Sequence, residues 1–115
     1  MSYNEGRYEA ITIASGATGS NAFQTIGCNR GSFLLPTMTG TTITFNVSDS
    51  LTEPAVGSSG WTACPIEGNE TNPLTTASGK TYSLPVKAMN FRWLQLVSGS
   101  AEGAARTIYI WCPSS

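Results

Sequence analysis

Polar and apolar residues alternate with a period of two through most of the chain, and turn residues interrupt the alternation at short intervals. The clearest run is residues 42–47, in which Ile43, Phe45 and Val47 fall on one side of an extended backbone. The pattern predicts strands at residues 8–14, 22–26, 32–35, 42–47, 61–64, 81–84, 91–97 and 106–111. About eight short strands, separated by Gly, Pro and Ser-rich turns, are typical of a sandwich or barrel.

These segments predict an all-β protein with one antiparallel, jelly-roll-like β-sandwich. At 115 residues the chain is the length of one domain. We expect residues 8–115 to form that domain and residues 1–7 to form an N-terminal arm. Residues 67–80 show no strand pattern and are expected to be a surface loop. A single helical turn is expected near residues 86–89.

The chain carries few charges, and this changes the expected partners. Only 11% of the residues are charged, against roughly 25% in ordinary soluble proteins. The formal net charge is −1, and Lys and Arg are not clustered, so a nucleic-acid partner is not expected. No apolar run approaches the ~20 residues that span a bilayer, so no membrane partner is expected either. A weakly charged surface suits a protein that packs into a crowded assembly.

The three cysteines, Cys28, Cys64 and Cys112, are widely spaced and odd in number. Such a set is a poor framework for disulfides. The first residues lack the apolar run of a secretory signal, so we expect synthesis in a cytoplasm that keeps thiols reduced. Cys28 is expected to be a small buried residue, and a Cys64–Cys112 disulfide stays open as an alternative.

Residues for catalysis or metal binding are scarce. The chain has no histidine, which removes imidazole-based triads and most zinc sites. We expect its carboxylates to be solvated surface groups, and these are Glu5, Glu9, Asp49, Glu53, Glu67, Glu70 and Glu102. The sequence therefore predicts a protein that is not an enzyme and that holds no metal or cofactor.

The aromatic residues near the C-terminus point to a contact surface. In residues 91–97 and 106–111 the aliphatic side chains alternate with a second set that contains the aromatic ones. If these two strands are neighbours, the second set forms an apolar patch on the outer face of one sheet, as protein interfaces often do. The candidate interface residues are Trp93, Val97, Tyr109, Trp111 and Trp61. The alternative is that the N-terminal arm or the 67–80 loop covers them.

The order of several segments resembles a family of viral proteins. These segments are Phe-Leu-Leu-Pro at 33–36, Ile-Thr-Phe-Asn-Val-Ser-Asp at 43–49, Gly-Trp at 60–61, Tyr-Ser-Leu-Pro at 82–85, and the last two strands with their Ser98-Gly99 turn. Over residues 33–110 this resembles small virion proteins of tailed bacteriophages, the β-sandwich or jelly-roll decoration (cement) and head-fibre proteins. The chain departs from them in a longer stretch before Trp61 and in its Trp111-Cys112-Pro113 ending.

The resemblance implies a structural role and no catalytic residue. The first hypothesis is a decoration protein on the capsid surface of a virion, made in the host cytoplasm. It would bind the major capsid protein or other virion subunits, and a homo-oligomer, with a trimer favoured, would act through many weak contacts. In this hypothesis residues 1–14 could add a strand to a neighbour's sheet. The alternative is a carbohydrate- or receptor-binding module of a head fibre or tail, with sugars stacked on Trp61, Trp93 or Trp111.

Overall fold

The computed structural model describes residues 6–113, and within that range the chain forms nine β-strands and one 3₁₀ helix. The elements are β1 (Arg7–Ile13), β2 (Phe23–Gln24), β3 (Ser32–Leu34), β4 (Thr42–Ser48), β5 (Thr62–Ala63), β6 (Leu74–Thr75), β7 (Thr81–Ser83), η1 (Val86–Asn90), β8 (Trp93–Ser98) and β9 (Arg106–Cys112). The predicted all-β fold is confirmed, and each of the eight predicted segments overlaps a strand.

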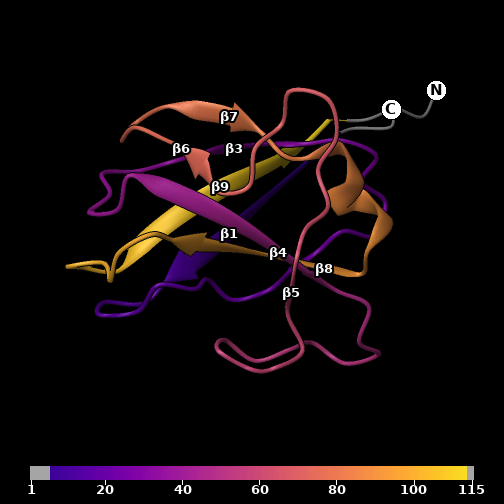
Figure 1. Cartoon of the computed structure of the whole chain (residues 1–115), viewed down its shortest axis with the longest axis horizontal. Helices are drawn as coiled ribbons and strands as arrows, with labels where there is room; N and C mark the ends of the chain where they lie inside the picture. Colours follow the sequence, from indigo (N-terminus) through magenta and orange to yellow (C-terminus); the bar gives the residue numbers. More distant parts are fainter. Residues whose placement is uncertain (1–5, 114–115) are drawn as a thin grey trace.

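The strands make two antiparallel sheets that pack face to face (Figure 1). One sheet has the order β1-β9-β3-β7, and the other has the order β2-β8-β4-β5, with the short β6 also paired to β4. The first strands pair with the last ones in a nested order, β1 with β9, β2 with β8, β3 with β7 and β4 with β5. Nested pairing of this kind, closed into two sheets, is a jelly roll.

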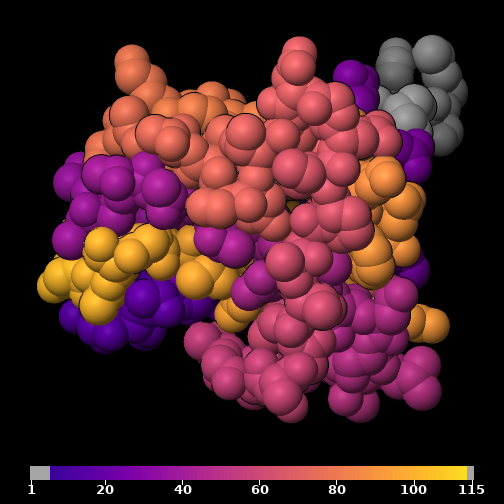
Figure 2. All heavy atoms as spheres, viewed as in Figure 1, coloured from indigo at the N-terminus to yellow at the C-terminus, as the bar shows by residue number. Residues whose placement is uncertain are grey.

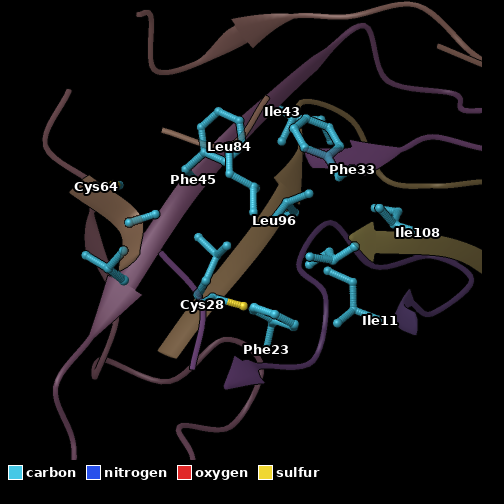
Figure 3. Close-up of a cluster of buried hydrophobic side chains, with 14 of the residues drawn as sticks. Ile11, Phe23, Cys28, Phe33, Ile43, Phe45, Cys64, Leu84, Leu96 and Ile108 are labelled. Carbon is cyan, nitrogen blue, oxygen red and sulfur yellow. The ribbon is translucent and has the colours of Figure 1, made fainter. Parts of the chain in front are cut away.

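The alternation predicted from the sequence places one side of each long strand in the core. In β4 the side chains of Ile43, Phe45 and Val47 are all at most 2% exposed, and those between them face outward and are half-buried. The Phe45 ring packs edge-on against Phe33 of the opposite sheet, with 5.6 Å between ring centres. Figure 3 shows these rings with Ile43, Leu84 and Leu96 between the two layers. Apolar burial between the sheets therefore holds the sandwich together.

The N-terminal segment differs from the prediction at Arg7. Residues 1–5 of the expected arm lie outside the described residues, but Arg7 already belongs to β1. All seven residues of β1 pair with β9 of the same chain, from Arg7 with Cys112 to Ile13 with Arg106. Arg7 therefore belongs to the domain and not to an arm, and the strand expected at residues 8–14 is confirmed, since the burial of Ile11 and Ile13 fixes β1 in its own sheet.

The connections over the other sheet are long. Residues 49–61 contain no strand, and the predicted loop at 67–80 contributes the two-residue β6 as its one strand in the described structure. Figure 2 shows the segment between β4 and β7 crossing one broad face of the molecule. The expected helical turn is present as η1, in which Ala88 N–H donates to the carbonyl of Pro85.

Candidate functional site

The structure separates the five candidate interface residues into two groups. A single patch required β8 and β9 to be neighbouring strands, but they belong to different sheets. Their aliphatic rows are buried as expected, but they meet across the core instead of lying side by side. Trp93 and Val97 are therefore on the outer face of one sheet, and Tyr109 and Trp111 are on the outer face of the other. The predicted single patch is wrong, because alternation tells which side chains share a face but not which strands are adjacent.

The outer face of the β1-β9-β3-β7 sheet is uncharged and carries three aromatic rings. The strand registers place its outward residues in three rows, which are Tyr8-Trp111-Ser32-Ser83, Ala10-Tyr109-Leu34-Thr81 and Thr12-Thr107. Tyr8 is 71% exposed and Tyr109 is 49% exposed. We call these ten residues the neutral face. Exposed rings on a surface without charges are typical of protein contact sites.

The ring of Trp111 is held in place on this face. It lies against Tyr8, with 4.5 Å between the ring centres. It also covers Gly6, where a side chain would collide with the indole. Trp111 is consequently half-buried, and Tyr8 and Tyr109 are the more accessible rings. The sequence analysis did not include Tyr8 among the interface candidates. The alternation of residues 8–14 nevertheless places its side chain on the face of the strand away from Ile11 and Ile13.

The outer face of the β2-β8-β4-β5 sheet is more polar and has two shallow hollows. One hollow is lined by Trp93 together with Gln24, Asp49, Leu51, Asn90 and Arg92. The other is lined by Trp61 and Val97, together with Asn46, Gln95 and Thr18. The indole N–H groups of both tryptophans are used inside the protein, since Trp93 donates to the carbonyl of Ser50 and Trp61 to that of Ala55. Their rings are thereby fixed at the rims of the two hollows.

Two cysteines that are 84 positions apart form a disulfide, Cys28–Cys112, with 5.7 Å between their Cα atoms. The expectation that all thiols stay reduced is wrong for this pair, and so is the alternative of a Cys64–Cys112 pair. The turn at residues 25–28 makes this pairing possible. In this turn the Cys28 N–H donates to the carbonyl of Thr25, and Gly27 has a φ of 80°. Only glycine adopts that φ readily, and the turn brings Cys28 back to the end of β9.

The third cysteine, Cys64, is a buried free thiol. Its burial, together with the nearby negative charge of Glu70, raises the pKa of the thiol to about 11. The thiolate is the reactive form, so this cysteine is chemically protected in the folded protein. It is a core residue and makes no reactive site.

One carboxylate is a core group instead of the solvated surface group that the sequence predicted. Glu102 is 1% exposed, and burial by itself would raise its pKa. Four donors reverse that effect, namely the Ser98 hydroxyl, the backbone N–H groups of Thr39 and Gly40, and the Arg106 guanidinium. Together they lower the pKa of Glu102 to about 2. The carboxylate ties the β8–β9 turn to the loop before β4, which is a structural role.

The described residues offer little else for chemistry. Within residues 6–113 no group of three or more Cys, Asp or Glu side chains is arranged to hold a metal ion. In the same part of the chain, no helix is long and apolar enough to cross a membrane. The surface features that remain as candidate sites are the neutral face and the two hollows beside the tryptophans.

Comparison with known proteins gives little guidance. No protein family and no curated protein matches the sequence. A solved structure described as "Bacillus endospore appendages form a novel family of disulfide-linked pili" aligns with all of this chain and with 96% of its own chain. The sequence identity is 18% and the TM-score is 0.40. A likeness at that level carries no argument about function.

Proposed function

We propose that this chain is a non-enzymatic structural subunit that acts by binding other protein subunits through its neutral face. The most specific form of the proposal is a decoration protein on the head of a tailed bacteriophage, in contact with the major capsid protein. The sequence resemblance over residues 33–110 supports the viral form. The neutral face supports the structural role, and it is the observation on which the proposal rests.

The size of the neutral face fits a contact that is weak alone and strong in many copies. Four strands at ~4.8 Å spacing, with three outward residues along the longest of them, cover about 300 Å². Stable interfaces bury about 800 Å² on each partner, so one such contact is less than half of a standard interface. A subunit repeated over a shell gains avidity from multivalency, so a small contact is sufficient there.

The experiment is co-sedimentation with phage heads that lack the protein, followed by the mass of the free chain in light scattering. A Tyr109→Lys variant places a charge in the middle of the neutral face, on a side chain that is 49% exposed and outside the core. We expect this variant to lose most of its binding to heads. The matched control is Leu51→Lys, an exposed apolar residue at the hollow beside Trp93. Loss of head binding in the control alone would refute the neutral face as the contact.

The hollow beside Trp93 supports a second candidate function, carbohydrate binding. An aromatic ring fixed beside Gln24, Asp49, Asn90 and Arg92 has the composition of a sugar site, in which a ring stacks and polar groups hold hydroxyls. In this function Leu51→Lys and Gln24→Ala would reduce retention on host-surface glycans, and Tyr109→Lys would not. Retention that none of these substitutions changes would eliminate the hollow as a glycan site.

A further inference from the structure

The backbone of β1 is open along the side that faces away from β9. In the described part of the chain, turn and loop hydrogen bonds reach this side at Thr12, whose N–H donates to the Asn21 side chain and whose carbonyl accepts from Asn21 N–H. The backbone N–H and C=O groups of successive residues in an antiparallel strand face alternate neighbours. Those of Tyr8 and Ala10 therefore face the same open side as those of Thr12. Both have exposed side chains. The segment from Gly6 to Ala10 is thus a short free edge.

A free strand edge can pair with a strand of another molecule. For a second copy of β1, the charged side chains of Arg7 and Glu9 decide which residues lie opposite one another. When two copies of β1 pair antiparallel, one residue lies opposite the same residue of the other copy, and we call that residue the centre of the register. The residues whose backbone groups face the open edge must pair with each other, so the centre can be Arg7, Tyr8, Glu9 or Ala10. Centring on Arg7 sets Arg7 against Arg7, and centring on Glu9 sets Glu9 against Glu9; like charges directly opposite destabilise a sheet. Centring on Ala10 sets Tyr8 against Thr12, whose edge groups are already bonded to Asn21.

The register centred on Tyr8 has none of these conflicts. It sets Arg7 of each copy opposite Glu9 of the other, and these two side chains already lie near one another within one copy, with 3.6 Å between Arg7 Nε and Glu9 Oε2. It sets the small Ala10 opposite Gly6, the residue that the Trp111 ring covers. The edge-facing pairs are Tyr8 with Tyr8 and, twice, Gly6 with Ala10. Each of these three pairs exchanges two backbone hydrogen bonds, which gives about six.

We propose that β1 pairs with β1 of a second copy of this chain, antiparallel and centred on Tyr8, so that two sheets become one. The inference deepens the proposed structural function, on which it rests, by naming the first partner and the strand that meets it. Because Tyr8 is opposite Trp111 within each sheet, the paired sheet carries an uninterrupted row of two Trp111 and two Tyr8 rings. The two neutral faces together cover about 600 Å², close to the area that a standard interface buries on each partner.

The test is a disulfide that forms in one register alone. In a Cys64→Ala background, Tyr8→Cys places two cysteines in a hydrogen-bonded antiparallel pair with Cα atoms about 5.5 Å apart, which suits a disulfide. The matched control, Ala10→Cys, changes an exposed residue on the same strand, and in this register its two copies are about 13 Å apart along the strand. Under mild oxidation we expect roughly tenfold more covalent dimer from Tyr8→Cys than from Ala10→Cys.

The other outcomes overturn the inference. Equal cross-linking of both variants indicates random collision, preferential cross-linking of Ala10→Cys indicates another register, and no cross-linking of either indicates no β1 contact. Unchanged urea unfolding of the variants before oxidation, with Cys28–Cys112 intact, ensures that a negative result is not a folding failure. Head binding by the unmodified chain is measured separately, so the β1 pairing can fail while the proposed function stands. A dimer mass in light scattering also distinguishes this contact from the trimer expected from the sequence.

Discussion

Replacing Glu102 with Gln should destabilise the protein strongly at neutral pH and little in acid. The carboxylate is buried and accepts hydrogen bonds from Ser98, Thr39 and Gly40 as well as from the Arg106 guanidinium. The glutamine amide has the same shape as the carboxylate but only one acceptor oxygen. Its NH₂ group would face hydrogen-bond donors, from which it cannot accept. The substitution also leaves Arg106 without a negative partner.

The magnitude follows from the lowered pKa. A fall from the ordinary value of 4.5 to about 2 means that the folded state favours the ionised carboxylate by about 3 kcal/mol. Because the folded pKa is the lower one, the unfolded chain binds more protons between pH 2 and pH 4.5. This stabilisation is therefore complete above about pH 5 and is lost as the pH falls towards 2.

The assay is urea unfolding of the wild type and of Glu102→Gln at several pH values between 2 and 7. We expect the difference in unfolding free energy to be about 3 kcal/mol at pH 7 and to shrink with a slope of about 1.4 kcal/mol per pH unit below pH 4.5. Glu53→Gln, at an exposed loop position, is the control and should leave stability unchanged. A difference that stays constant across this pH range would show that the ionised carboxylate is not what stabilises the turn.

Three further predictions concern the cysteines and the Trp111 ring. Replacing both Cys28 and Cys112 with Ser should lower the urea-unfolding free energy by about 4 kcal/mol, because the disulfide closes a loop of 84 positions, and an unchanged value would refute the pairing. The Cys64 thiol, whose pKa is raised to about 11 by burial and Glu70, should not react with a thiol reagent at pH 8 until urea unfolds the chain; rapid labelling of the folded protein would contradict its burial. Gly6→Ala should displace the Trp111 indole and shift the tryptophan fluorescence to longer wavelength, with little change in unfolding free energy because the ring is a movable surface group; an unchanged spectrum would place the ring elsewhere.

The parts of the structure that could be predicted from the sequence are those that local alternation encodes. Period-two runs located eight of the nine strands of the described chain and placed Phe45, Ile108 and Ile110 in the core. The two-residue β6 was missed, because Leu74 and Thr75 are too few to show a period, and their strand exists through pairing with β4. The face that each aromatic occupies was likewise correct for Trp93 and Trp111, since parity along a strand is a local property.

The sequence by itself determined that this protein is an all-β sandwich with few charges and no histidine, together with the inward or outward direction of most side chains. The tertiary structure alone decided which strands are neighbours, that Cys28 meets Cys112, that Glu102 is enclosed by four donors, and that β1 has an open edge at Tyr8. The physical reason is that side-chain direction depends on the backbone of one strand. Lateral order depends instead on contacts between segments far apart in the chain, and these form only when the whole core closes.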